Sequence, residues 1–278
     1  MLIIGLTGSI ATGKSTVSSI LSSPPYSLPI IDADLLARQV VEPGTAGYKA
    51  IVRHFGGTTP DLLVPASSDP SSPMPEDGPD GKGRPINRPA LGRRVFGTDE
   101  SRMRDRAVLN GIVHPAVRWA MFRAAARAYL AGHRAVVLDV PLLFESRIDV
   151  VCGVSVVVAV RDPAVQMARL RARDPHLSAD EAEGRVRSQG DVRVKARRAE
   201  ERGKGWGAVV WNDGDREELR REVDRVMGEI QSTSPRWWSW GLLLCPPAGV
   251  AVGLWTFWQN LRINRRWAEL ELREKSKL

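Results

Sequence analysis

Residues 6–16 read LTGSIATGKST, and this stretch decides the fold. Residues 8–15 match in full the G-x-x-x-x-G-K-[ST] pattern of a phosphate-binding loop. The apolar run at residues 1–6 predicts a buried strand before it, and residues 16–21 have the apolar spacing of a helix after it. A glycine-rich turn before an ordinary helix is the alternative, but strand, loop and helix follow in the order that the motif requires. We therefore predict a site for a nucleoside triphosphate, with Mg²⁺ as its companion ion.

Each part of this loop has a predicted role. Gly8 and Gly13 permit backbone conformations in which successive amides point inward, and the helix N-terminus favours an anion. Lys14 is expected to reach the terminal phosphates of ATP and to act in catalysis, while the Ser15 hydroxyl binds Mg²⁺. The predicted nucleotide-binding residues of the loop are Gly8, Ser9, Ile10, Ala11, Thr12, Gly13, Lys14, Ser15 and Thr16.

Composition narrows the class of protein. The chain of 278 residues has a net charge of +8, but residues 236–278 alone contain seven Arg or Lys against three Glu. The charge left for the rest of the chain is what an enzyme of phosphorylated ligands carries, so we expect no nucleic acid partner. The two cysteines lie far apart in the sequence and suggest no disulfide framework.

Two carboxylates follow the next predicted strand, residues 28–31. Asp32 and Asp34 stand where this strand ends, which is the side on which open α/β sheets collect ligands. A kinase that acts on an alcohol needs a carboxylate to accept the proton of the hydroxyl. We assign that role to Asp34, and Asp32 is expected to cap the following helix or to support the site.

A third carboxylate, Asp139, ends the apolar strand at residues 135–138. In phosphate-loop enzymes a carboxylate at such a strand end holds Mg²⁺ directly or through water. We therefore predict Asp139 as a catalytic residue, with Asp139 and Ser15 as the metal ligands.

Five short apolar strands separated by helices are predicted along the chain, at residues 1–6, 28–31, 135–138, 154–160 and 207–214. This alternation predicts the α/β class, with a doubly wound parallel five-stranded sheet of the P-loop kinase type. Residues 90–130 have helical patterning, in which Pro115 is expected to start a new helix. Residues 57–86 are dense in Pro, Gly, Ser and Asp, and are expected to form a disordered insertion.

Taken together, these residues resemble one family, the dephospho-coenzyme A kinases. The resemblance covers residues 1–235 apart from 66–84, and the order and spacing of the segments make it specific. The segments that carry it are GLTGSIATGKST, IIDADLLARQVVEPGT, INRPALGRRVF, LNGIVHPAV, VVLDVPLLFE, DPAVQMARLRARD and WNDG.

The resemblance implies ATP-dependent phosphorylation of the ribose 3′-hydroxyl of dephospho-CoA, the last step to coenzyme A, with Asp34 as the general base. It implies a core of residues 1–34, 134–165 and 199–235, a helical substrate domain at 35–133, and a helical lid at 166–198. Arg169 would be a catalytic lid arginine and Arg173 would contact the nucleotide. Asn212 would lie near the adenine.

The C-terminal extension is not part of the family pattern. No charged residue occurs between Arg236 and Arg262, and tryptophans stand at both ends of this segment. Such a segment predicts membrane contact through residues 236–261, followed by a basic tail at 262–278 that lies against anionic lipid. Pro246 and Pro247 would bend or break a spanning helix, so a bent anchor, a hairpin and an interfacial helix stay open. Deletion of 236–278 is expected to release an active protein.

No signal peptide precedes the first strand, so the catalytic domain is expected to face the cytosol from an intracellular membrane. The endoplasmic reticulum, the mitochondrial outer membrane and lipid droplets are not distinguished, and the oligomeric state is not readable. Two other functions stay open at this point: a different small-molecule or nucleoside kinase of the same fold, and an inactive nucleotide-binding protein on a membrane.

Overall fold

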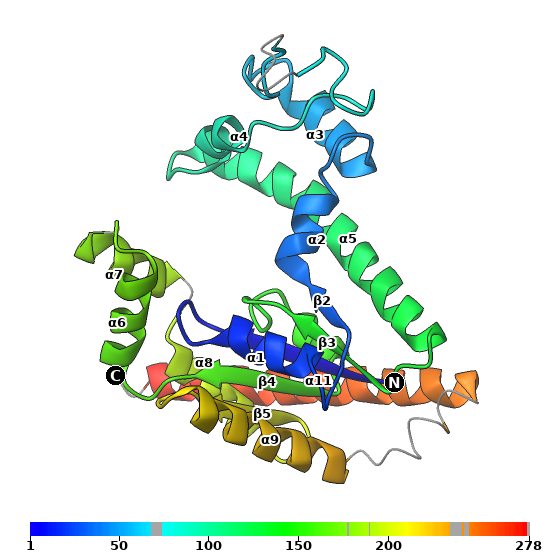
Figure 1. Cartoon of the computed structure of the whole chain (residues 1–278), viewed down its shortest axis with the longest axis vertical. Helices are drawn as coiled ribbons and strands as arrows, with labels where there is room; N and C mark the ends of the chain where they lie inside the picture. The colour runs from blue at the N-terminus through cyan, green and yellow to red at the C-terminus, as the bar shows by residue number, and fades with distance from the viewer. Residues whose placement is uncertain (68–73, 177, 189, 234–240, 242–244, 277–278) are drawn as a thin grey trace. The chain divides into compact units, whose positions relative to one another are not determined.

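The computed structural model describes the whole chain except residues 68–73, 177, 189, 234–240, 242–244 and 277–278. Two compact units are present: unit 1 comprises Met1–Ile31 and Ala125–Leu278, and unit 2 comprises Asp32–Ala124. Figure 1 labels the helices and strands, which are β1 (Leu2–Gly8), α1 (Lys14–Ser22), β2 (Ile30–Asp32), α2 (Ala33–Gln39), α3 (Ala46–Phe55), α4 (Arg88–Val95), α5 (Glu100–Leu130), β3 (Ala135–Asp139), η1 (Ile148–Val151), β4 (Val154–Ala159), α6 (Pro163–Arg173), α7 (Ala179–Ser188), α8 (Val192–Glu201), β5 (Gly207–Trp211), α9 (Arg216–Thr233) and α11 (Pro246–Lys275).

The sheet has five parallel strands, as the sequence predicted, and their order is β2-β3-β1-β4-β5. β1 lies at its centre, where Leu6 pairs with Asp139 of β3 and with Val156 of β4. Because β1, β3 and β4 are parallel, their carboxyl ends meet at one edge. The phosphate loop and Asp139 are thereby brought to the same edge of the sheet.

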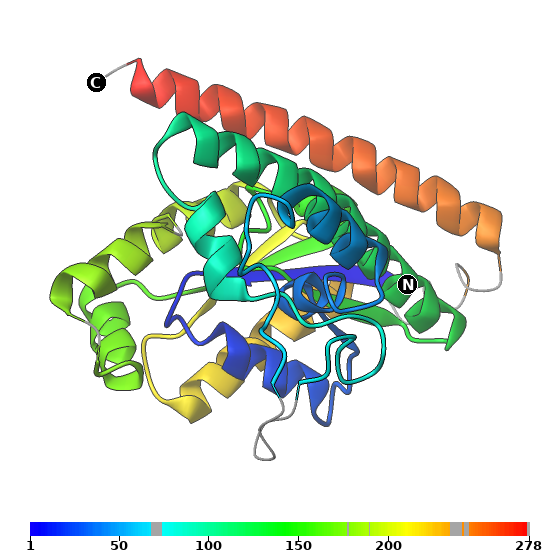
Figure 2. The same cartoon turned by 90° about the horizontal axis from the view of Figure 1, so that it is seen from above.

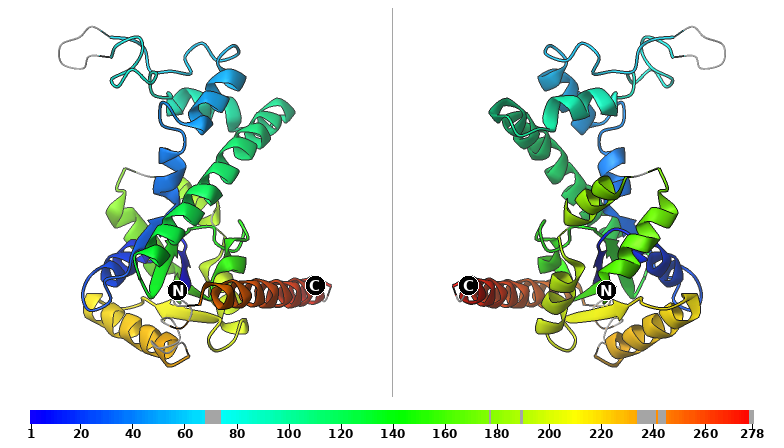
Figure 3. Two further views of the ribbon diagram at one scale, coloured as in Figure 1. Left: turned by 90° about the vertical axis from the view of Figure 1, so that its right-hand side faces the viewer. Right: turned by 90° about the vertical axis from the view of Figure 1, so that its left-hand side faces the viewer.

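Helices cover both faces of the sheet, which explains why its strands are apolar without alternation. Val156 and Val158 of β4 pack with α1 and α9 on one face. Val157 and Ala159 of the same strand pack with α8 on the other face. Figure 3 shows α1 and α9 on one side of the sheet, and α8 and α11 on the other. The doubly wound α/β class is confirmed.

The helix α8 differs from its expected assignment to the lid at 166–198. Val192, Ala196 and Ala199 of α8 are buried in the core of the second face. Since this helix forms a layer of the sheet, only α6 and α7 of the expected lid stand outside the core layers.

The C-terminal helix α11 runs as one long helix against unit 1 (Figure 2). Pro246 and Pro247 occupy its first turn, where proline is favoured. Of the two effects expected of this pair, a bend and a break, the described residues show a helix that begins at the pair and is not bent there. The second half of the helix packs on η1, and its side chains contact Arg197 and Arg198 of α8. Trp267 is buried there. One side of the basic tail expected to lie on lipid is therefore docked on the protein, while Arg262, Arg265 and Arg266 are exposed.

Among the described residues, no helix is long and apolar enough to cross a membrane. The spanning anchor expected at residues 236–261 is thus not supported. The tryptophans expected at the first interface, Trp237, Trp238 and Trp240, lie outside the described residues.

Unit 2 holds a small core of its own, in which Ile51, Phe55, Leu62 and Val95 are buried. Leu62 belongs to the insertion expected to be disordered, so the described flanks of that insertion differ from the expectation. Backbone bonds also join them: Leu63 pairs with Ile86, and Ser67 pairs with Met74. The helix α5 continues through Pro115, in contrast to the helix start predicted there.

Candidate active site

The phosphate loop lies between β1 and α1 in unit 1, as predicted. Gly13 is the N-cap of α1 and has φ of 91°, a left-handed conformation that glycine adopts without strain. A Cβ at this position would also lie 2.2 Å from the side-chain nitrogen of Asn212. Gly13 is therefore required both by its backbone conformation and by the close approach of Asn212.

Asn212 follows β5 and contacts the phosphate loop directly. Its buried amide nitrogen donates to the carbonyl of Thr12 at 2.8 Å, and its backbone N–H donates to Ala159. The sequence placed Asn212 near the adenine. The structure shows the contact of its side chain with the backbone of the loop.

Lys14 points to Asp139 at the edge of the sheet. The Lys14 ammonium lies 2.5 Å from an Asp139 carboxylate oxygen, and both side chains are largely buried. The two residues come from α1 and β3, which are more than a hundred positions apart in the sequence. Two predicted catalytic residues are thus brought together by the pairing of β1 with β3.

The segment that follows Asp139 is tied down on two sides. The Thr7 hydroxyl donates to the carbonyl of Pro141 at 2.8 Å, and the Lys195 ammonium donates to the same carbonyl at 3.2 Å. Lys195 also pairs with Glu145 at 3.0 Å. These contacts restrain the backbone just beyond the Asp139 carboxylate.

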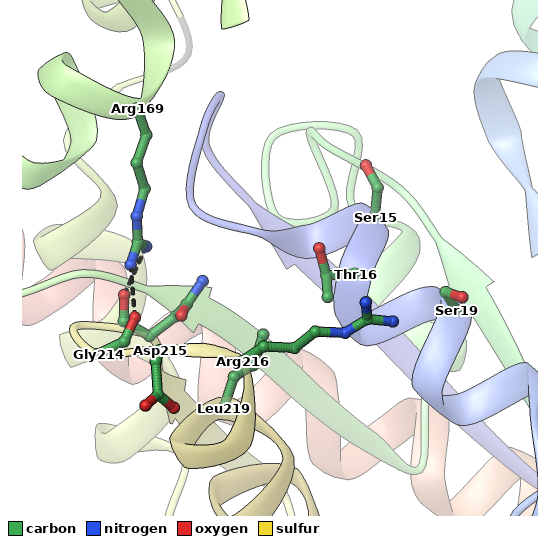
Figure 4. A pocket seen from close by; sticks show the side chains of 9 residues that line it. Ser15, Thr16, Ser19, Arg169, Gly214, Asp215, Arg216 and Leu219 are labelled. Carbon is green, nitrogen blue, oxygen red and sulfur yellow. Dashed lines mark hydrogen bonds between the residues drawn. The ribbon is translucent and has the colours of Figure 1, made fainter. Parts of the chain in front are cut away.

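A cavity of about 500 Å³ opens beside the start of α1 (Figure 4). Figure 4 shows α1 on one side of it, and the segment leading into α9 on the other. Its lining residues are Ser15, Thr16, Ser19, Arg169, Asn212, Gly214, Asp215, Arg216 and Leu219. The cavity therefore continues from the phosphate loop toward the segment that the sequence associated with adenine.

The two predicted lid arginines have different surroundings. Arg169 lines the cavity, and its guanidinium donates to the carbonyls of Asn212 at 2.7 Å and Gly214 at 3.0 Å (Figure 4). Arg173 does not line it and pairs instead with Asp174 at 3.0 Å. The hydrogen bond from Arg173 lowers the pKa of the Asp174 carboxyl below its usual value.

The described residues contain no group of three His, Cys, Asp or Glu side chains that could hold a metal ion on its own. A magnesium ion that binds together with a nucleotide needs only one or two oxygen ligands from the protein, because phosphate and water supply the rest. A hydroxyl at Ser15 and a carboxylate at Asp139 are of that chemical type.

Asp32 and Asp34 open the helix α2 in unit 2. The Asp32 carboxylate accepts from the N–H groups of Asp34 and Leu35 at 2.8 and 3.0 Å, so Asp32 is the N-cap. The Asp34 side chain is left to line a cavity of about 400 Å³ within unit 2. Its other lining residues are Ala37, Arg38, Val41, Glu42, Pro43, Ile51, Pro85, Ile86, Arg88, Leu91, Leu109 and Val113.

Several residues of these sites escaped the sequence analysis. Gln166 donates to the carbonyl of Ile10 in the phosphate loop, and Lys195 restrains the segment after Asp139. Arg38 and Arg88 line the unit 2 cavity. The sequence does contain a signal for Gln166. It is a polar residue one turn before Leu170, on the face of α6 that is buried.

Comparison with known proteins shows which family this chain is similar to. The profile of a family described as dephospho-CoA kinase matches residues 2–66 and 77–215. The chain is 41% identical over 236 residues to dephospho-CoA kinase CAB5 of Saccharomyces cerevisiae, covering 85% of this chain and 86% of that protein. It is 39% identical over 225 residues to a dephospho-CoA kinase of Bacillus cereus, covering 81% and 95%.

Solved structures have the same fold. The crystal structure of TT1252 from Thermus thermophilus has a TM-score of 0.60 and 28% identity, covering 82% of this chain and 97% of that one. A dephospho-CoA kinase from Campylobacter jejuni has a TM-score of 0.54 at 22% identity, covering 83% and 98%. The fold is thus shared with these proteins over most of their length.

Proposed function

Since this chain belongs to the dephospho-CoA kinase family, we propose which of its residues carry out each part of that family's reaction. The protein is a kinase that uses ATP to phosphorylate the ribose 3′-hydroxyl of dephospho-CoA, the final step of coenzyme A biosynthesis. The observation that carries this function is the 41% identity with the yeast dephospho-CoA kinase over 85% of the chain. The intact phosphate loop and its Lys14–Asp139 pair support it.

ATP is placed with its phosphates on the loop and its nucleoside in the adjoining cavity. The inward N–H groups of the loop and the Lys14 ammonium would bind the β- and γ-phosphates. Thr16, Arg169 and Asn212 line the cavity and would contact the α-phosphate and the nucleoside. Arg173 is the weaker of the two lid candidates, because it does not line the cavity and pairs with Asp174.

Mg²⁺ is proposed at Ser15 and Asp139. The hydroxyl of Ser15 and the carboxylate of Asp139 would hold the ion together with phosphate oxygens and water. When bound, the ion neutralises charge that develops on the phosphates. In that state the Asp139 carboxylate would exchange its contact with Lys14 for the metal, and the Lys14 ammonium would turn to the γ-phosphate.

Dephospho-CoA is proposed to occupy the cavity of unit 2. Val41, Ile51, Ile86, Leu91 and Leu109 give this cavity an apolar wall that suits the extended arm of the substrate. The guanidinium groups of Arg38 and Arg88 supply positive charge for its diphosphate. Asp34 lines the same cavity and is available to the ribose.

The chemical step follows from these roles. The Asp34 carboxylate accepts the proton of the ribose 3′-hydroxyl, and the oxygen forms a bond to the γ-phosphorus. The bond from that phosphorus to the β–γ bridging oxygen breaks, and ADP leaves with this oxygen. Lys14 and Arg169 would stabilise the negative charge on the transferring group.

The direct test uses the full chain with Mg²⁺, ATP and dephospho-CoA, and identifies products by mass. Adenosine and other nucleosides serve as competing acceptors. We expect coenzyme A and ADP in equal amounts, with little product from the nucleosides. Phosphorylation of a nucleoside at a comparable rate, or ATP binding without transfer, would contradict the proposed function.

We also propose that the exposed side of α11 lies on an anionic lipid surface rather than across a bilayer. Val250, Leu254, Trp255, Phe257 and Trp258 form an exposed apolar stripe along the first half of the helix. Further along it, Arg262, Arg265 and Arg266 are exposed, and the Arg262 guanidinium stacks 4.6 Å from the centre of the Trp258 ring. Apolar and aromatic side chains beside arginines are typical of interfacial helices.

Flotation with vesicles tests this surface. We expect the protein to float with vesicles that contain phosphatidylserine and to float less with pure phosphatidylcholine. Serine at both Trp255 and Trp258 should abolish flotation without loss of kinase activity. Leu272→Ser, at an exposed position of the same helix outside the stripe, is the matched control and should float normally. Absence of flotation in the unaltered protein would refute the proposal.

A further inference from the structure

A phosphate loop binds anions only while its N–H groups point inward, so its carbonyls must point outward and find donors there. Three of these carbonyls accept hydrogen bonds from side chains in this structure. The Ser9 carbonyl accepts from the Thr12 hydroxyl at 2.9 Å, and the Thr12 carbonyl accepts from Asn212 at 2.8 Å. The Ile10 carbonyl accepts from the side-chain amide of Gln166 at 2.7 Å.

The peptide between Ile10 and Ala11 is held in a strained orientation. Ala11 has φ of 61°, in the left-handed region, and it is the one residue of the loop other than glycine with positive φ. For a residue with a Cβ this conformation costs about 1–2 kcal/mol. Rotation of the Ile10–Ala11 peptide would relieve the strain, but it would also turn the Ala11 N–H away from the phosphate side.

Gln166 is placed to prevent this rotation. Gln166 is only 3% exposed. It lies near the start of α6, and its side-chain amide contacts the outer side of the loop at the Ile10 carbonyl. If the Ile10 carbonyl turned away, the buried amide of Gln166 would lose its acceptor. The free energy cost of this unsatisfied donor makes rotation of the peptide unfavourable. We propose that Gln166 is a positioning residue, which locks the Ile10–Ala11 peptide in the orientation that binds phosphate.

This role rests on the proposed binding of ATP to the loop. It also ties that loop to α6, the helix that carries Arg169 at the edge of the nucleotide cavity. A displacement of α6 would weaken the hold on the peptide and so lower the affinity for the nucleotide. Gln166 is assigned no contact with ATP itself.

The test is a double-mutant cycle between Gln166→Leu and Ala11→Gly, with the affinity for ATP measured by calorimetry. Gln166→Leu should weaken ATP binding about tenfold, as expected for loss of one buried hydrogen bond. Ala11→Gly alone should change the affinity little. In the double variant, affinity should return to within about threefold of the unaltered protein, because glycine keeps the positive φ without strain.

A merely structural role for Gln166 predicts a different pattern. It would lower thermal stability and turnover together, and glycine at position 11 would restore neither. The proposed positioning role instead predicts that Gln166→Leu raises the KM for ATP and leaves the KM for dephospho-CoA unchanged. Ala11→Gly should then restore the KM for ATP. Gln231→Leu makes the same chemical change at an exposed position of α9 and should behave as the unaltered protein.

Gln166→Glu keeps the shape of the side chain but removes the amide donor. This variant replaces Gln166→Leu in the test if the leucine variant does not fold. It should weaken ATP binding at least as strongly. Normal affinity in both variants, or a loss that Ala11→Gly does not reverse, would overturn the proposal. Failure of the unaltered protein and of Gln231→Leu to bind ATP at all would instead refute the nucleotide site.

Discussion

Asp32 and Asp34 are two residues apart at the start of one helix, yet their surroundings give them different roles. The Asp32 carboxylate is engaged by two N–H groups of α2, as expected for an N-cap. Asp34 stands in the first turn and faces the cavity of unit 2. The sequence left Asp32 as either a cap or a supporting residue, and the structure selects the cap.

We expect Asp34→Asn to spare ATP binding and to lower turnover at least about a hundredfold, because the amide cannot accept the proton of the hydroxyl. Turnover is measured from the formation of coenzyme A, and ATP affinity by calorimetry. Asp32→Asn is the matched control: asparagine caps helices as well as aspartate, so turnover should stay within about threefold. Near-normal turnover of the Asp34 variant would remove this residue from the role of base.

At the scale of the element, the C-terminal helix α11 is attached to the rest of unit 1 through a buried polar network. Arg202, the C-cap residue of α8, and Asp149 of η1 pair at 3.0 Å with both side chains almost fully buried. The Arg202 guanidinium also donates to Asn260 and Asn264 of α11, and Asn264 donates to Asp149 at 2.8 Å. Burial lowers the pKa of Arg202, while Asp149 favours its charged form. The helix thus supplies polar partners to an ion pair that water cannot reach.

Arg202→Met should destabilise the protein by about 3–5 kcal/mol, since it leaves the Asp149 carboxylate buried without a counter-charge. The double variant Arg202→Met with Asp149→Leu should be less destabilised than the single one. Urea unfolding followed by tryptophan fluorescence measures both. Equal losses in the single and double variants would show that the network does not act as a unit.

Arg221→Met on the exposed side of α9 is the control for this series, because its side chain is 75% exposed and its ion pair is long. A change within about 0.5 kcal/mol is expected there.

The network also revises the expectation that residues 236–278 are dispensable. Deletion of residues 236–278 would expose the surface that Trp267 covers, and it would remove the asparagines that bond Arg202 and Asp149. The shortened protein should therefore have a lower melting temperature.

At the scale of the whole molecule, the proposed sites divide the two substrates between the two units. The phosphate loop and the nucleotide cavity belong to unit 1, and the cavity with Asp34, Arg38 and Arg88 belongs to unit 2. Each unit has its own core, so each ligand is expected to stabilise mainly the unit that holds its site.

Hydrogen exchange measured by mass spectrometry tests this division. A non-hydrolysable ATP analogue with Mg²⁺ should slow exchange at residues 8–19 and 212–219. Dephospho-CoA alone should slow exchange at residues 33–55 and 85–113, with little change in the phosphate loop. Protection by dephospho-CoA confined to unit 1 would contradict the placement of the substrate in the unit 2 cavity.

Much of the fold was predictable because its signals are local. The phosphate loop, the five apolar strands and the carboxylates that follow them are short patterns whose physical causes lie within a few residues of one another. Lys14, Ser15, Asp34 and Asp139 could be proposed for the same reason. Pro115 and the flanks of residues 57–86 were misjudged, because propensity and composition do not reveal the packing of Leu62 and its neighbours in unit 2.

By itself, the sequence determined the α/β class, the phosphate loop and the family, since these depend on residue types at fixed spacing. Only the tertiary structure decided that Gln166 and Asn212 hold the loop, that Lys14 meets Asp139, and that the second half of α11 is docked rather than free. These are contacts between residues that lie more than fifty positions apart, and no local pattern reports them. Some of them arise because parallel strands bring distant segments to one edge of a sheet. Others arise because the buried guanidinium of Arg202 needs polar partners, which Asp149 and the asparagines of α11 provide.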